Sequence, residues 1–554
     1  MRMRQPSGSS TGPSPDWDDT YRDLSAAVAD REPSVDDLDR LATAAYLTGR
    51  DEEGFDVWGR AHRACLDAGD LPRAAWFGIR LGLCLGFKGD LARARGWVDR
   101  TQHLLEQEKV ECVEQGYLEH AAAMCRILET GDVTGAHGGF VRALKTATRF
   151  EDRELDTLAR IGLGRCRIYL GEIAEGLALL DEAMVAVEGR EISTVAVGDS
   201  YCTVIDACRE LLDLQRFAAW TEAFTGWCDS QVGLAIYGGH RSLHRAELLF
   251  FRGDWVAASA EADQAVRRLD QPRNMLTLGG AHYVRAELRR LQGDFEAADR
   301  DYRAAHERGC EPNPGLALLR LAQGRTDVAE AAIRRLECET LDGISRARML
   351  GAFTEILLAA GDEAGAGAAA VELATVAKEH ESQYLTGVAR HAHAAVLLVG
   401  GESRRALVLL RQARRLWGEL DTPYEGARTR VLLAQACRDL GDLETADLEL
   451  DAARATFLQL GARPDSAQVE RVRDPSADRA PSALTPREVE VLIRIASGAT
   501  NRAIARDLFI SEKTVASHIS HIFTKVGLTS RAAATAFAYE HRYLDRGGSS
   551  VRQS

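Results

Sequence analysis

The residues best suited to chemistry lie near the C-terminus, where small polar side chains recur at helical spacing between 511 and 526. At 100° per residue they form one face of a helix. The residues on that face are Lys513, Ala516, Ser517, Ser520, His521 and Thr524. No acidic residue follows Glu512 in this stretch. Such a surface can enter the major groove of DNA and approach base edges without steric clash or charge repulsion.

The opposite face of the same helix is apolar and must be buried. It consists of Val515, Ile519, Ile522 and Val526. Ser511 is placed to cap the helix at its start, and Gly527 to end it. A helix over 511–526 therefore has one face for a protein core and one for a ligand.

Three further helices are predicted around this one. The first of these helices begins with a capping box formed by Thr485-Pro486-Arg487-Glu488. It ends at Gly498. Its predicted apolar face is Val489, Leu492, Ile493 and Ala496. Thr500 caps a short second helix that buries Ile504 and Leu508, and Phe509-Ile510 turns into the helix described above. Ser530 caps a fourth helix that runs through Tyr539. Two short helices joined by a tight turn predict a helix-turn-helix.

The run from 484 to 539 resembles the LuxR-type DNA-binding domain of bacterial transcription regulators. The matching elements are LTPRE, the stretch 498–505, the turn Phe509-Ile510-Ser511, Thr514-Val515, His518 and the stretch 525–531. The resemblance implies that the third helix binds double-stranded DNA and that the fourth forms dimer contacts. A sigma-factor DNA-binding region is the rival family, and nothing upstream resembles a promoter-melting region.

The resemblance also implies roles for individual residues. The expected base contacts are Ala516, Ser517, Ser520 and His521. The expected phosphate contacts are Thr500, Asn501, Lys513, Thr514, Lys525 and Arg531. The sequence departs from the family at Ala516, where Lys or Arg is frequent, and at Ala503, where Glu is frequent. The methyl group of Ala516 favours recognition through thymine methyl contacts, serine hydroxyls or DNA shape over direct guanine recognition.

Length and charge indicate a separate body. A chain of 554 residues is too long for one hydrophobic core. The formal charge is −14, but residues 484–546 hold nine Arg or Lys and six Asp or Glu, so this segment carries +3 and the rest −17. The eleven cysteines include no C-x-x-C pair, and the sequence has neither an apolar leader nor an apolar run of 18 residues. These features predict a cytoplasmic protein with no membrane span.

The body is predicted to be a helical repeat. Leu-x-x-Gly-Asp or a close variant recurs about every 40 residues, followed by an Ala-rich helix. One marker is missing, and Leu214-Gln215 stands in its place. The pattern resembles a long, degenerate tetratricopeptide repeat and predicts an all-α solenoid of helical hairpins. The predicted domains are a disordered N-terminus over 1–16, the solenoid over 17–461, a linker over 462–483, the DNA-binding domain over 484–546 and a disordered tail over 547–554.

No nucleotide-binding loop, nucleophile elbow or zinc-protease helix occurs, so no enzyme activity, cofactor or metal is expected. The sequence predicts a sequence-specific transcription regulator whose solenoid senses a small-molecule effector or a partner protein. RNA polymerase is a candidate partner, and a homodimer through the fourth helix is expected. The alternative is an interaction scaffold, or an adaptor to a separate ATPase or cyclase, with a weakened DNA-binding domain; Ala516 is the feature that favours it.

Overall fold

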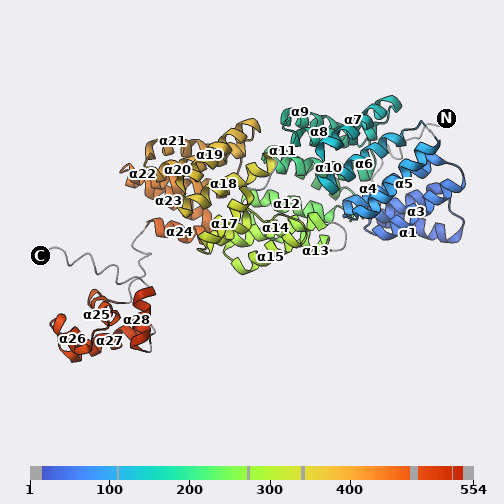
Figure 1. The fold of residues 1–554 in the computed structure, drawn as a ribbon. Helices are drawn as coiled ribbons and strands as arrows, with labels where there is room; N and C mark the ends of the chain where they lie inside the picture. The colour runs from blue at the N-terminus through green and yellow to red at the C-terminus, as the bar shows by residue number, and fades with distance from the viewer. Residues whose placement is uncertain are drawn as a thin grey trace. The chain divides into compact units, whose positions relative to one another are not determined.

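The computed structural model describes residues 15–108, 111–270, 275–337, 343–473, 484–526, 528 and 530–540. Every regular element in these ranges is an α-helix, which confirms the all-α prediction. The chain divides into two compact units, a body over 1–466 and a head over 467–554 (Figure 1). The N-terminus up to 14, the linker from 474 to 483 and the tail over 547–554 lie outside the described residues.

The helices of the body form consecutive hairpins, in which each even-numbered helix from α2 onward packs against the next helix. Their bounds are α1 Trp17–Asp30, α2 Val35–Leu47, α3 Asp51–Asp67, α4 Leu71–Lys88, α5 Leu91–Glu108, α6 Glu114–Thr130, α7 Val133–Phe150, α8 Arg153–Tyr169, α9 Ile173–Glu188, α10 Thr194–Glu210, α11 Leu214–Asp229, α12 Gly238–Arg252, α13 Trp255–Leu269, α14 Met275–Gln292, α15 Phe295–Glu307, α16 Gly315–Ala322, α17 Thr326–Glu337, α18 Gly343–Ala360, α19 Glu363–Glu379, α20 Gln383–Val399, α21 Ser403–Glu419, α22 Pro423–Asp439 and α23 Leu443–Leu460. This arrangement confirms the predicted tetratricopeptide-like hairpin repeat.

The repeated Gly-Asp marker, or a close variant of it, forms the turn within every described hairpin except that of α10 and α11. Gly253 has a φ of 81°, a left-handed conformation that glycine adopts without a Cβ penalty. The carboxylate of Asp254 then caps α13 by accepting a hydrogen bond from the backbone N–H of Ala257 at 3.1 Å. Ala258, one turn further, is fully buried and lets the paired helices approach closely.

The missing marker lies at Leu212-Asp213, two residues before its predicted place. Leu212 takes the left-handed turn with a φ of 54°, and Asp213 caps α11 by accepting from the N–H of Arg216 at 3.1 Å. A leucine in this conformation costs roughly 1 kcal/mol more than a glycine. The sequence analysis misplaced this marker because the left-handed turn is kept here by a leucine, and the glycine that identifies the other turns is absent.

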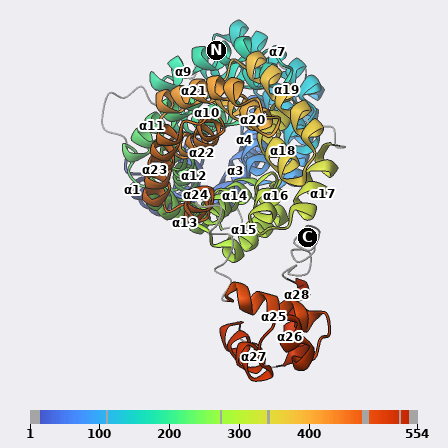
Figure 2. The same ribbon diagram turned by 90° about the vertical axis from the view of Figure 1, so that its left-hand side faces the viewer.

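The body winds into a superhelix whose successive turns touch each other (Figure 2). Three contacts between segments far apart in sequence have almost the same separation, about 170 residues: Leu212 with Ser382, Gly253 with Pro423, and Gly293 with Pro464. In the first, the Ser382 hydroxyl donates a hydrogen bond to the Leu212 carbonyl at 3.1 Å. In the second, a Cβ added to Gly253 would lie 2.6 Å from Pro423 Cγ. One superhelical turn therefore takes about 170 residues, or slightly more than four repeats.

The segment assigned to the linker begins with a helix, α24, over Arg463–Arg473. The head then contains α25 Pro486–Ala496, α26 Asn501–Asp507, α27 Glu512–Val526 and α28 Arg531–Glu540. Gly527, predicted to end the third of these helices, lies outside the described residues. Among the described residues, none of the helices is long and apolar enough to cross a membrane.

The buried face of α25 differs from the predicted one. Val491 and Ile495, which the prediction omitted, are buried in the core of the head, together with Leu492 and Ala496. Val489 and Ile493 are only partly buried. The face is rotated because the capping residue Glu488 is itself buried on the inner side, and Val491 and Ile495 follow it at helical spacing.

Candidate nucleic-acid interface

Helix α27 has the two faces that its sequence predicts. Val515 and Ile522 are fully buried in the head, and Ile519 and Val526 pack against them as partly buried residues. The residues of the outward face are all exposed: Lys513, Ala516, Ser517, Ser520, His521 and Thr524. A surface without a carboxylate, polar apart from the methyl of Ala516, therefore extends from the second residue of α27 almost to its end.

The turn between α26 and α27 fixes the start of this helix. The Ser511 hydroxyl caps α27 by accepting a hydrogen bond from the N–H of Thr514 at 3.1 Å, and it also pairs with the Thr514 hydroxyl at 2.7 Å. Phe509 has a φ of 54°, and its side chain is 95% exposed. The Thr500 hydroxyl caps α26 in the same way, accepting from Ala503 N–H at 3.3 Å.

Asn501 and Arg531, both expected at phosphates, contact each other. The guanidinium of Arg531 donates to Asn501 Oδ1 at 2.9 Å and also to the backbone carbonyl of Ala499. These bonds join the N-terminal ends of α26 and α28. Three of the six predicted phosphate contacts, Thr500 included, therefore lie together at one end of the helix-turn-helix.

Lys525, another expected phosphate contact, forms an ion pair inside the head. Its Nζ donates to the two carboxylate oxygens of Glu488 at 2.9 and 2.7 Å. Glu488 is only 3% exposed and also accepts from the N–H of Thr485 at 2.6 Å. Burial alone would raise the pKa of Glu488, but the hydrogen bonds from Lys525 and Thr485 hold it at about 2. The carboxylate is thus ionised, and it links α25 to the end of α27.

The predicted site residues consequently fall into two groups. Lys513, Ala516, Ser517, Ser520 and His521 of the α27 face project outward. The others make hydrogen bonds within the head: Thr500, Asn501, Thr514, Lys525 and Arg531. The sequence identified Glu488 as a capping residue but not as the partner of Lys525. No local pattern joins these two residues, because they are 37 positions apart.

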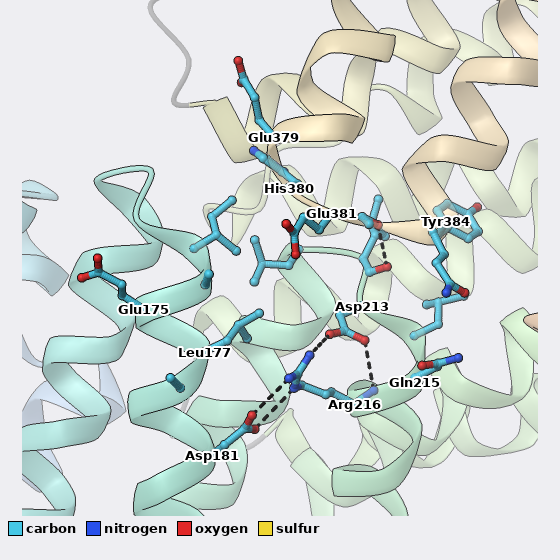
Figure 3. Close-up of a pocket in the computed structure, with 18 of the residues that line it drawn as sticks. Glu175, Leu177, Asp181, Asp213, Gln215, Arg216, Glu379, His380, Glu381 and Tyr384 are labelled. Atoms are coloured by element: carbon cyan, nitrogen blue, oxygen red, sulfur yellow. Dashed lines mark hydrogen bonds and ion pairs between the residues drawn. The ribbon is translucent and has the colours of Figure 1, made fainter.

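The body contains a cavity of about 550 Å³ between two successive superhelical turns (Figure 3). One wall comes from α9 and the start of α11, and the other from the end of α19 and the start of α20. Arg216 reaches between two carboxylates of the first wall, with ion pairs of 3.1 Å to Asp181 and 2.7 Å to Asp213. The lining also includes Glu379 and Glu381, so carboxylates predominate. Burial lowers the pKa of His380.

Comparison with known proteins matches the head to one family. Residues 482–538 match the family described as "Bacterial regulatory proteins, luxR family". Similar proteins include a nitrate/nitrite response regulator homolog of Haemophilus influenzae, 31% identical over 134 residues, and LiaR of Bacillus subtilis, 40% identical over 62 residues. These alignments cover 21% and 11% of the chain, and 63% and 29% of the two relatives. The chain thus spans less than two thirds of either relative.

The body is similar to solved helical-repeat structures at low identity. One is the crystal structure of Rap protein complexed with competence and sporulation factor. The match covers 70% of the present chain and 99% of the Rap chain, with 11% identity and a TM-score of 0.37. Another is the human IFIT1 dimer with m7Gppp-AAAA. That match covers 80% of the present chain and 94% of the IFIT1 chain, with 14% identity and a TM-score of 0.39. At this level the two structures indicate nothing about a ligand.

The head is therefore a LuxR-type helix-turn-helix, a DNA-binding domain of the kind found in bacterial regulatory proteins. In this chain it is attached to a large tetratricopeptide-like body.

Proposed function

We propose that this protein is a sequence-specific transcription regulator that inserts α27 into the major groove of double-stranded DNA. The observation that carries the proposal is the outward face of α27, exposed and free of carboxylates inside the segment that matches the LuxR family. Its hydroxyls and imidazole can hydrogen-bond with base edges, and the methyl of Ala516 can contact thymine. Ser517, Ser520 and His521 are accordingly the proposed base contacts, together with Ala516.

The phosphate contacts are proposed for Thr500, Asn501, Lys513, Thr514, Lys525 and Arg531. An ammonium has three N–H donors and a guanidinium five. Lys525 and Arg531 therefore keep donors for phosphate oxygens beyond the bonds they make inside the head. The internal bonds hold these side chains in place, which reduces the conformational entropy lost on binding.

The body is proposed to sense an effector or a partner protein in the cytoplasm, and thereby to control the head. Its support is a concave helical repeat of the kind that binds other molecules, with a carboxylate-rich cavity between its turns. The head is proposed to bind as a homodimer, with RNA polymerase as a candidate partner. No cofactor or catalytic activity is assigned.

The test is genome-wide DNA capture with the full chain beside a Lys513→Ala/His521→Ala variant. Lys378→Ala, which removes an exposed lysine of the body, is the matched control. We expect discrete promoter peaks for the wild type and the control and their loss in the double variant. Binding in vitro should weaken steeply with salt, because phosphate contacts release counterions. Identical peaks for all three chains, or peaks for none, would refute the proposal.

A further inference from the structure

Two neighbouring outer helices of the body, α21 and α23, each expose an apolar side chain at the same place in the repeat. Val408 is 56% exposed and Leu448 is 65% exposed. They are 40 residues apart, and each is the sixth residue of its helix. Removal of such side chains from water favours association with another apolar surface. An apolar pair at matching heights on adjacent helices is a surface suited to another protein.

The charges around this pair are opposite on the two helices. Val408 lies between the exposed Arg404 and Arg411 on α21. At the equivalent positions of α23, Leu448 lies between the exposed Glu444 and Asp451. The two helices are already neighbours in the body, where Arg414 of α21 forms an ion pair of 2.6 Å with Glu449 of α23. The outward face of α21 thus has an apolar side chain between two positive ones. The outward face of α23 has an apolar side chain between two negative ones.

This arrangement is complementary to itself under one kind of two-fold symmetry. The two-fold axis lies in the interface between α21 and α23 and runs parallel to both helices. Rotation about it places α21 of one copy opposite α23 of the other. The paired helices then run in the same direction, and their equivalent residues lie at the same height. Arg404 then meets the position of Glu444 in the second copy, and Val408 meets that of Leu448. An axis perpendicular to the helices would instead set α21 against α21, with arginine opposite arginine.

We propose that the outer faces of α21 and α23 form a dimer interface of the body, and that its occupant is a second copy of this chain. Each helix of about 17 residues is roughly 25 Å long, and two of them present about 500 Å² per copy. The total of roughly 1,000 Å² is at the lower limit for a specific interface. An interface of this size suits a reversible dimer, which salt should weaken because charged pairs contribute to it.

The test is sedimentation equilibrium of the full chain over a range of concentrations, without DNA. Leu448→Asp should raise the dissociation constant at least about tenfold, since it places a charge in the centre of the interface. Arg404→Glu and Glu444→Arg should each do the same through like-charge contacts. The double variant Arg404→Glu/Glu444→Arg should recover dimerisation, because the opposite charges meet again. Val256→Asp, at an 84% exposed position of α13, is the matched control and should change nothing.

Several outcomes would overturn the proposal. One is a monomer at all concentrations, as expected if these faces are merely solvated or bind a different partner. Another is a dimer that Leu448→Asp and Arg404→Glu leave unchanged, since the head would then hold the copies together. A charge swap that fails to restore dimerisation, with a circular dichroism spectrum like that of the wild type, would refute the proposed pairing. Each of these results is independent of whether the head binds DNA.

Discussion

Replacing Lys525 by Met leaves a buried carboxylate without its cation. The pKa of Glu488 is about 2, compared with an ordinary value of 4.5, and this difference corresponds to about 3 kcal/mol as an upper limit. The hydrogen bond from Thr485 N–H survives the substitution. The Lys525 side chain is 38% exposed, so solvent screens its share of the interaction. We therefore expect Lys525→Met to destabilise the head by roughly 1–2 kcal/mol.

The assay is thermal unfolding of residues 467–554, a compact unit with its own core, followed by circular dichroism. For a domain of this size the expected loss is roughly 5–15 °C in Tm at pH 7. The Glu488→Gln/Lys525→Met double variant should be more stable than Lys525→Met, because an amide can be buried without a counter-charge. Lys513→Met, at an exposed site of the same helix, is the control and should leave the Tm within a few degrees of the wild type.

The pH dependence has a definite sign. The pKa of Glu488 is depressed in the folded state, so the pair contributes its stability in full above about pH 4.5. That contribution is lost as the pH falls from about 4.5 towards 2. The difference in stability between wild type and Lys525→Met should therefore shrink over this range. A double variant as unstable as Lys525→Met, or a difference that stays constant down to pH 2, would refute the reasoning.

Three further predictions concern the recognition helix and the body. Ser511→Ala should cost about 1 kcal/mol of stability, through the lost cap of α27, and should weaken binding to all DNA sequences alike, as measured by titration against a panel of sites. Ser517→Ala and Ser520→Ala should instead alter the preferred sequence in a selection from random DNA; a uniform loss of affinity would contradict the face assignment. Gly162→Ala should lower the Tm of the full chain, because the added Cβ would overlap the ring of Phe140 and cost about 1–3 kcal/mol, whereas an unchanged Tm would show that the ring can move away.

The sequence predicted the elements of the head well, because caps and helical periodicity are local signals. Ser511, Thr485 and the outward face of α27 could all be identified from neighbours a few residues away. The predicted inner face of α25 was rotated because the sequence identified Glu488 only as a capping residue and gave no sign that it is buried. Its carboxylate is paired with Lys525 of α27, which lies 37 positions away in the sequence.

The body shows the same division between local and distant information. The hairpins follow from a repeated motif, and Leu212 escaped the prediction because its turn carries no glycine. The contacts between superhelical turns could not be predicted, because they depend on small rotations that accumulate over about four repeats. The cavity lies at such a contact, which explains why no sequence motif pointed to it.

The spacing of about 170 residues between touching turns changes how the body should unfold. In an open solenoid each repeat contacts only its neighbours, so the ends can fray while the middle persists. Here the bond from Ser382 to Leu212, and the contacts of Gly253 and Gly293 with later prolines, connect repeats four units apart. Loss of the final repeats would remove partners from the middle of the body. The array therefore gains a cooperativity that nearest-neighbour contacts alone do not supply, together with the slower folding of a chain with long-range contacts.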